Sequence, residues 1–381
     1  MPAKNQARTN WAPRVIVSGG GTGGHIFPAV AIANEIKHRY ADAEFLFVGA
    51  KGRMEMEKVP KAGYAIEGLP IAGLQRKKWW KNLSLPLKIW QSLRQSKSII
   101  ERFRPDLVIG TGGYAGGPVL YAASGLGIPT LILEPNAFAG LANKWLGKRV
   151  DKVCIAFKNM DRYFPKEKLV MTGNPVREQM LRSALSTSAT ALGTDKRNKE
   201  ILLIGGSQGA RTLNRALRAS TAAIAAHPET YWTWQCGALY IDEYKDCETA
   251  RLPNVEIKAF IDRMDEAYGQ ADLVIGRAGA ITIAELTYLG KASILVPSPN
   301  VAEDHQTVNA KALEKEGATV IIRDADAQAD LVSSAISLVA DSDRLGSIAQ
   351  AAKSMGRPGA VARIVDEAIN LIPVTSKTVA V

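Results

Sequence analysis

A glycine-rich loop early in the chain carries a histidine that could act as a general base. Residues 19–25 read GGGTGGH and directly follow the apolar segment 14–17. Glycines let a backbone approach a diphosphate closely, and the helix after such a loop turns N–H groups and its positive dipole end toward an anion. His25 ends this loop, and an imidazole accepts protons readily near neutral pH. The spacing therefore predicts an anion site with a base; a tight turn with a locally bonded histidine is the alternative.

Two more loops of this kind follow later apolar segments. Residues 110–118 read GTGGYAGGP, whose N–H groups could hold an anion or simply permit a close strand-to-helix crossing. Residues 205–211 read GGSQGAR, with a hydroxyl donor at Ser207. They lack the Gly-Lys-Ser/Thr ending of a Walker loop, which argues against ATP hydrolysis. No acid follows the segment 45–48 to hold a ribose, which argues against an NAD site.

Two charged residues near these loops could contact a nucleotide. Glu285 lies in the segment 276–285 (GRAGAITIAE) and could accept both hydroxyls of a ribose. Alternatively, it could complete a capping box with Thr282. Arg177 follows GNPV near the expected junction of the two halves. It could neutralise a leaving phosphate or be an ordinary surface arginine.

The composition is that of a globular protein with an anionic partner. The chain has 381 residues, 46% of them hydrophobic, which is enough for two domains with separate cores. Its formal net charge of +11 favours nucleic acid, anionic lipid or a phosphorylated substrate as a partner. The three cysteines contain no C-x-x-C pair, so we expect no disulfide or zinc site and a reducing cytoplasm. The polar residues 1–10 do not resemble a signal peptide.

The elements that must position these loops are short buried strands that alternate with helices. The charge-free segment 107–133 is long enough for a membrane helix, but seven glycines and two prolines interrupt it, which predicts a strand, a loop, a helix and a strand. A polar stretch at 183–199 separates two such series. Alternation of this kind predicts parallel sheets with ligands beyond the carboxyl ends of the strands. The predicted strands are 14–17, 44–48, 106–109, 129–133, 201–204, 272–275 and 293–296.

These series predict an α/β protein with two Rossmann-like, doubly wound domains that face a cleft. We expect the first domain at 1–176 and the second at 177–356. The helix candidate 360–371 has no strand of its own. We therefore expect the C-terminal segment 357–381 to pack back on the first domain.

The segment 75–104 concentrates positive charge beside tryptophan. It contains nine basic residues against the single acid Glu101, so most of the net charge lies here. Basic residues interleaved with tryptophan are typical of a surface that docks on an anionic bilayer, with roughly 1 kcal/mol for each basic residue. A core stripe with a solvated basic face is one alternative. Nucleic acid is another, but no recognised binding module is present. The predicted docking residues are Trp79, Trp80, Leu83, Leu87 and Trp90.

Seven segments, in this order, resemble the MurG family of GT-B glycosyltransferases. They are GGGTGGH at 19–25, GTGGYAGGP at 110–118, GNPVR at 173–177, IGGSQGAR at 204–211, FIDRM at 260–264, RAGAITIAE at 277–285 and EDHQTVNA at 303–310. The resemblance implies the GT-B fold and an inverting transfer of N-acetylglucosamine (GlcNAc) from UDP-GlcNAc. The acceptor would be the muramic acid 4-hydroxyl of lipid I, undecaprenyl-diphosphate-MurNAc-pentapeptide. The product would be lipid II, in the last cytoplasmic step of peptidoglycan precursor synthesis.

The resemblance also implies where the enzyme works and with what. It places a peripheral protein on the cytoplasmic face of the bacterial inner membrane, in a pathway needed for cell shape and division. It implies an acceptor-binding, membrane-facing first domain and a UDP-GlcNAc-binding second domain. Other wall-synthesis proteins become candidate partners, whereas nucleic acid, a cofactor and a metal are not expected. Asp324-Ala325-Asp326 has DxD spacing but lies far from the glycine loops in sequence, so we discount it as a metal site.

The positions of individual residues in the matching motifs give the roles that the resemblance implies for them. The resemblance assigns Thr22, Gly23, Gly24 and Asn136 to the surroundings of the donor sugar and diphosphate. It assigns Arg177 and Ser207, with the adjacent Gln208 and Gly209, to the nucleotide, and the backbone of Ile261 to the uracil. It assigns Ala280, Ile281, Thr282, Ile283, Ala284 and Glu285 to the diphosphate and ribose, and Gln306 to the sugar. His25 is the candidate base, with Glu134 as the second choice.

The chain departs from the family pattern at two places. Family members often read His-Glu-Gln-Asn where this chain has Leu133-Glu134-Pro135-Asn136, which concentrates the base role on His25 or Glu134. A serine is common where this chain has Ala115-Gly116. A cytosolic UDP-GlcNAc 2-epimerase would share the architecture but would not need the basic segment. A membrane- or nucleic-acid-binding protein with vestigial loops is disfavoured by the intact loops in both halves.

Overall fold

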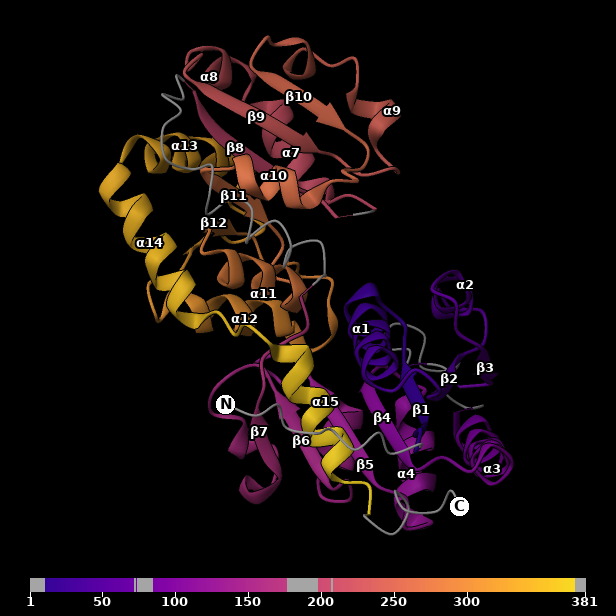
Figure 1. Ribbon diagram of the computed structural model, residues 1–381. Helices are drawn as coiled ribbons and strands as arrows, with labels where there is room; N and C mark the ends of the chain where they lie inside the picture. Colours follow the sequence, from indigo (N-terminus) through magenta and orange to yellow (C-terminus); the bar gives the residue numbers. More distant parts are fainter. Residues whose placement is uncertain (1–10, 72, 74–84, 177–197, 207, 374–381) are drawn as a thin grey trace. The chain divides into compact units, whose positions relative to one another are not determined.

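The computed structural model of the chain divides into two compact units (Figure 1). The first comprises Met1–Pro135, Ala139–Pro175 and Gly359–Val381, and the second comprises Asn136–Phe138 and Val176–Pro358. Each unit has its own sheet and its own hydrophobic core, as a domain should. The residues that the structure describes are 11–71, 73, 85–176, 198–206 and 208–373.

A parallel seven-stranded sheet forms the centre of the first unit, in the order β3-β2-β1-β4-β5-β6-β7. The chain builds outward from β1 to β3, then returns to the other side of β1 and continues from β4 to β7. The topological switch point, where such sheets bind ligands, therefore lies between β1 and β4. The strands are β1 (Arg14–Gly19), β2 (Glu44–Ala50), β3 (Ile66–Leu69), β4 (Leu107–Gly112), β5 (Thr130–Glu134), β6 (Lys152–Ile155) and β7 (Leu169–Met171).

Helices cover both faces of this sheet because successive strand side chains point to opposite faces. Val15 and Val17 pack into the core with α1 and α15, whereas Ile16 packs into the core with α3, α4 and α5. The C-terminal helix α15 contacts α1, β4 and β6, so it completes the first unit (Figure 1). The helices are α1 (Gly23–Arg39), α2 (Glu55–Lys61), α3 (Leu85–Phe103), α4 (Gly116–Gly125), α5 (Leu141–Leu146) and α15 (Ala360–Asn370).

A parallel six-stranded sheet, in the order β10-β9-β8-β11-β12-β13, forms the centre of the second unit. Its switch point lies between β8 and β11, by the same reasoning. Its strands are β8 (Lys199–Ile204), β9 (Thr230–Gln235), β10 (Val255–Lys258), β11 (Leu273–Gly276), β12 (Ala292–Leu295) and β13 (Val320–Ile321). Its helices are α7 (Arg211–Ala219), α8 (Thr221–Ala225), α9 (Ile241–Tyr244), α10 (Met264–Gln270), α11 (Ala280–Leu289), α12 (His305–Glu314), α13 (Ala327–Ala340) and α14 (Ser342–Met355).

All seven predicted strands are present, and the segment 107–133 forms β4, α4 and β5 as predicted. The strands that the sequence did not reveal are β3, β6, β7, β9, β10 and β13, most of which are short. Most of the polar stretch at 183–199 lies outside the described residues. None of the helices in the described part of the chain combines the length and apolarity needed to cross a membrane. All three cysteines are free.

Candidate active site

The loops after β1 and β4 meet at the switch point of the first sheet, and their backbones touch. The Gly20 N–H donates to the Gly112 carbonyl at 3.2 Å. A Cβ on Gly113, whose φ is +95°, would lie 2.4 Å from the Gly20 oxygen. No side chain fits there, so the close approach itself requires glycine. The interpretation of the second loop as a close strand-to-helix crossing is therefore confirmed. Anion binding by this loop stays a prediction.

His25 lies in the first turn of α1 and is oriented by the loop after β4. Its Nδ1 lies 2.9 Å from the Thr111 carbonyl oxygen, and Thr111 Oγ1 donates to the His25 carbonyl at 2.8 Å. A carbonyl oxygen can only accept, so Nδ1 carries the proton of the neutral ring and the basic lone pair lies on Nε2. The side chain is partly buried at the carboxyl edge of the sheet. The local hydrogen bond thus orients the ring in a manner that suits a general base.

Glu134, the second candidate base, ends β5 and is 1% exposed. Its Oε2 accepts hydrogen bonds from the Gly140 N–H at 3.0 Å and from Asn143 Nδ2 at 2.9 Å. These donors come from the turn that leads into α5 and from α5 itself. The arrangement fits a residue that shapes this turn better than one that exchanges protons.

Two departures from the family pattern are accommodated by burial. Leu133 has no exposed surface and packs in the core that α1 and α15 cover. Ala115 is 1% exposed and packs in the core on the other face of the sheet. The Pro135 carbonyl accepts a hydrogen bond from Asn174 Nδ2 at 2.8 Å. Leucine and alanine at these positions therefore serve packing in this chain.

Asn136 belongs to the second unit, and the buried side chain of Asn309 binds it there. Asn309 of α12 has no exposed surface. Its Oδ1 accepts the Ala137 N–H at 2.8 Å, and its Nδ2 donates to Asn136 Oδ1 at 3.1 Å and to the Ala278 carbonyl at 3.2 Å. Asn309 therefore holds Asn136 beside the turn that opens α11.

In the second unit, the loop after β8 is pressed against the loop after β9. A Cβ on Gly209, whose φ is +85°, would lie 2.2 Å from the Cys236 carbonyl oxygen. A Cβ on Gly237 would lie 2.2 Å from Gly209. Asn214 of α7 fixes the same contact, since its Nδ2 donates to the Cys236 carbonyl at 2.9 Å and its Oδ1 accepts from Trp234 Nε1 at 3.0 Å. The fold thus brings the start of α7 to the switch point.

The segment 280–285 forms the start of α11 at the carboxyl end of β11. The N-cap residue of this helix is Gly279, so no side chain forms a capping hydrogen bond at its start. The capping-box interpretation of Thr282 and Glu285 is therefore wrong. Glu285 is 2% exposed, and its Oε2 accepts a hydrogen bond from the Tyr268 hydroxyl at 3.2 Å. Glu285 thus lies in the second turn of α11, where its carboxylate bonds Tyr268 and does not cap the helix.

Ile261, the residue assigned to uracil, lies three residues beyond the end of β10 and is 7% exposed. Arg263 follows it and binds Asp265 through both carboxylate oxygens, at 3.2 and 3.1 Å. Hydrogen bonds from Arg263 lower the pKa of Asp265 below its ordinary value. This ionised pair fixes the turn that carries Ile261 into α10.

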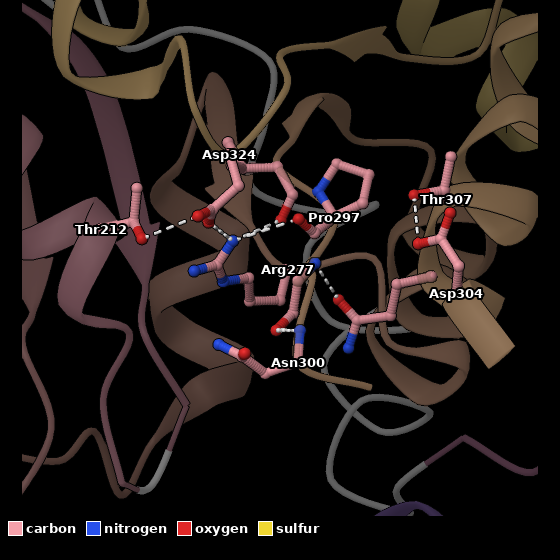
Figure 2. Close-up of polar contacts among 10 residues, drawn as sticks. Thr212, Arg277, Pro297, Asn300, Asp304, Thr307 and Asp324 are labelled. Atoms are coloured by element: carbon pink, nitrogen blue, oxygen red, sulfur yellow. Dashed lines mark hydrogen bonds and ion pairs between the residues drawn. The ribbon is translucent and has the colours of Figure 1, made fainter. Parts of the chain in front are cut away.

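Arg277 links several loops at the carboxyl edge of the second sheet (Figure 2). Its Nη1 donates to the Val296 and Pro297 carbonyls at 3.0 and 3.3 Å, and it forms an ion pair with Asp324 at 2.5 Å. Asp324 Oδ2 also accepts from Thr212 Oγ1 of α7 at 3.1 Å. The arginine therefore ties the starts of α7 and α11 to the loops after β12 and β13.

The two aspartates with DxD spacing are both engaged in ion pairs. Asp324 is engaged with Arg277 and Thr212, and Asp326 forms an ion pair with Arg323 at 2.5 Å. No group of three His, Cys, Asp or Glu residues within the described ranges could hold a metal ion.

Gln306, assigned to the sugar, lies at the start of α12. Its Oε1 accepts the Ser298 N–H at 2.9 Å, which joins α12 to the loop after β12. The two residues before α12, Glu303 and Asp304, have φ values of +58° and +50°. Left-handed backbone at consecutive non-glycine residues stores strain, which clusters at functional sites. Thr307 Oγ1 donates to Asp304 Oδ1 at 2.7 Å and supports this turn.

The membrane-docking prediction falls partly on α3. Leu87 and Trp90 are 58% and 57% exposed, so the interpretation of this stripe as core is wrong for both. The Arg94 guanidinium lies over the Trp90 ring, 5.8 Å from its centroid. The predicted residues Trp79, Trp80 and Leu83, like the nucleotide candidates Arg177 and Ser207, lie outside the described residues.

The sequence and structures of known proteins identify the chain's family. Residues 15–155 match the glycosyltransferase family 28 N-terminal domain, and residues 200–364 match the family 28 C-terminal domain. A relative from Parabacteroides distasonis is 48% identical over 363 residues, covering 94% of this chain and 98% of its own length. Its name is UDP-N-acetylglucosamine–N-acetylmuramyl-(pentapeptide) pyrophosphoryl-undecaprenol N-acetylglucosamine transferase. The crystal structure of Acinetobacter baumannii MurG is similar, with a TM-score of 0.76, 30% identity and coverage of 94% of this chain and 99% of that one.

The chain belongs to the MurG family. Its two parallel-sheet, Rossmann-like units are those of the GT-B fold, as predicted. A putative UDP-N-acetylglucosamine 2-epimerase from Listeria monocytogenes has a TM-score of 0.63 over 93% of this chain and 95% of its own, but only 13% identity. The epimerase shares the fold alone with this MurG-family chain.

Proposed function

We propose that this chain transfers GlcNAc from UDP-GlcNAc to the muramic acid 4-hydroxyl of lipid I, with inversion, to give lipid II. The observation that carries the proposal is the combination, in one MurG-family chain, of an oriented His25 at one switch point and a buried Glu285 at the other. The first offers a base for a hydroxyl. The second offers a carboxylate for a ribose.

The acceptor chemistry is assigned to the first unit. Nε2 of His25 takes the proton of the 4-hydroxyl as that oxygen attacks C1 of GlcNAc, and Glu134 is the second candidate. The new bond joins O4 to C1, and the bond from C1 to the UDP β-phosphate oxygen breaks, so the electron pair leaves with UDP. In the loop after β1, the Gly20 N–H donates to the Gly112 carbonyl. We assign Thr22, Gly23 and Gly24 to the diphosphate and donor sugar.

Donor binding is assigned to the second unit. The starts of α7 and α11 direct helix N-termini toward the carboxyl edge, where they favour the developing negative charge of UDP. Glu285 would hold the ribose, the Ile261 backbone the uracil, and Gln306 the sugar. Arg177, Ser207, Gln208, Gly209 and Asn136, together with the segment 280–284, complete the assignment. This arrangement stabilises a leaving diphosphate without a metal or a cofactor.

Glu285→Gln should weaken UDP binding roughly 10- to 100-fold, since a charge-assisted hydrogen bond contributes about 1.5–3 kcal/mol. Isothermal titration with UDP measures this directly. Tyr268→Phe, which removes the hydroxyl that donates to Glu285, should have a smaller effect in the same direction. Glu314→Gln, at an exposed position, is the matched control. Unchanged affinity in the Glu285 variant would remove Glu285 from the ribose site.

The same proposal includes docking on the anionic cytoplasmic face of the inner membrane, where the acceptor's lipid chain is embedded. The basic segment 75–104 supplies the charge, and Leu87 and Trp90 supply exposed apolar surface on α3. Aromatic and basic residues together suit the headgroup region of a bilayer. Other wall-synthesis proteins remain candidate partners on the same membrane.

The double substitution Leu87→Ala and Trp90→Ala should lower affinity for anionic vesicles roughly tenfold or more, because both side chains would bury apolar surface in the bilayer. Cosedimentation at low and high salt measures this, and wild-type binding should weaken with salt. Leu239→Ala, at a position 72% exposed in the second unit, should bind like wild type. Equal binding by the double variant would exclude α3 as the docking helix.

UDP release with and without the lipid acceptor tests the proposed reaction against the epimerase. A transferase should release UDP only when a lipid I analogue is present. Conversion of UDP-GlcNAc to an N-acetylmannosamine product without acceptor would overturn the proposal.

A further inference from the structure

A buried carboxylate that the mechanism does not use lies directly behind the first glycine loop. Glu55 is the first residue of α2 and is 1% exposed. It follows β2, which pairs with β1 in the sheet. Its side chain thus reaches from one βα loop to the neighbouring one that carries His25.

Both oxygens of this carboxylate accept backbone hydrogen bonds. Oε2 accepts the Gly21 N–H at 2.8 Å, and Oε1 accepts the Ala50 N–H at 3.0 Å. These two N–H groups stabilise a negative charge on the carboxylate, which connects the loop after β1 to the end of β2.

The surrounding backbone is shaped to admit this side chain. A Cβ on Gly20 would lie 2.2 Å from Glu55 Oε1, and a Cβ on Gly49 would lie 2.6 Å from its Cγ. Gly20, just after β1, and Gly49, within β2, thus leave space that Glu55 fills. Contact with Glu55 therefore explains these two glycines, and with them part of the glycine run at 19–21, without the approach of a phosphate.

We propose that Glu55 is a positioning residue, which holds the loop 20–22 so that His25 and the start of α1 face the acceptor. The proposal rests on the proposed transferase function. Because Gly20 donates to Gly112 and Gly21 donates to Glu55, an anion at this loop is bound by the next N–H groups, at 22–24. Glu55 thereby determines which N–H groups of the loop can bind an anion.

Glutamine cannot replace this carboxylate, although it has the same shape. One of its two terminal atoms is an NH₂ donor, which would face the N–H of Gly21 or of Ala50. A buried pair of donors without an acceptor is unfavourable. The loop should therefore turn away from its wild-type position in Glu55→Gln, and His25 and the N–H groups should turn with it.

The test compares Glu55→Gln with Glu57→Gln, which alters an exposed glutamate of the same helix that pairs with Lys61. In Glu55→Gln, we expect kcat to fall and KM for a lipid I analogue to rise, together lowering kcat/KM roughly 10- to 100-fold. KM for UDP-GlcNAc should rise as well, because Thr22, Gly23 and Gly24 of this loop are assigned to its diphosphate and sugar. A general loss of folded protein would lower kcat and leave both KM values unchanged.

Hydrogen–deuterium exchange of the segment 19–25 provides a readout that needs no activity. Exchange at Gly21 should be faster in Glu55→Gln than in wild type or Glu57→Gln. If Glu55→Gln fails to fold, Glu55→Asp takes its place, with the same changes in smaller degree because the carboxylate is one methylene shorter. Wild-type exchange and wild-type acceptor KM in a folded variant would overturn the proposal. Absence of transfer by wild type would instead overturn the proposed function, while the exchange result would still decide whether Glu55 holds the loop.

Discussion

Replacing His25 with alanine is expected to lower turnover roughly 10²- to 10⁴-fold, the range that a general base contributes. The Thr111 carbonyl fixes the ring so that Nε2 is the basic atom, and alanine offers no substitute. UDP affinity should change little, since the nucleotide is assigned to the second unit. Steady-state transfer kinetics and UDP titration on the same preparation measure both quantities.

His38 supplies the matched control for this experiment. It is an exposed histidine at the other end of α1, so His38→Ala should retain wild-type kinetics. Loss of UDP affinity with near-normal turnover in His25→Ala would exclude His25 as the base. The same loss of turnover in Glu134→Ala alone, with His25→Ala active, would transfer the role to Glu134.

Gly209→Ala is expected to disrupt the second unit's nucleotide site and to destabilise the fold by more than about 2 kcal/mol. The new Cβ would meet the Cys236 carbonyl oxygen at 2.2 Å, on a residue whose φ is +85°. The loops after β8 and β9 would have to separate, which moves the start of α7. Thermal unfolding and UDP titration measure the two effects.

The variant Gly206→Ala distinguishes the effect of backbone strain from the effect of a steric contact between the two loops. Gly206 has a φ of +79°, but a Cβ there would meet nothing within 4 Å. It should therefore cost only the roughly 1 kcal/mol of a left-handed alanine. If both variants unfold at the same temperature and bind UDP equally, the close approach of the two loops does not support the nucleotide site.

Much of the fold could be predicted from the sequence because the central strands of a parallel sheet are buried on both faces. Segments such as 15–17 and 201–204 therefore read as continuous apolar runs. The strands that were missed carry weaker signals. β13 has two residues, and β9 mixes aromatic and polar residues.

The candidate site was predicted at the level of loops but not of side-chain contacts. Glycine loops after strands indicated both switch points, since connectivity alone places those loops at the carboxyl edge. The contacts of Glu55, Asn309 and Arg277 were not predicted, because each of these side chains bonds backbone groups that are distant in sequence. Only the hydrogen bonds of the folded chain distinguish them from ordinary helix or surface residues.

The capping-box error has a similar cause. A threonine followed three residues later by a glutamate fits that motif, but the helix begins earlier, at Ala280. Glu285 therefore lies beyond the first turn and faces Tyr268. Helix boundaries are among the features that sequence patterns predict least well.

The transfer of radiolabelled GlcNAc from UDP-GlcNAc to a short-chain lipid I analogue, with free UDP followed in parallel, tests the central claim most directly. We expect a labelled disaccharide-lipid in an amount that equals the UDP released. UDP or N-acetylmannosamine formed without any labelled lipid product would contradict it.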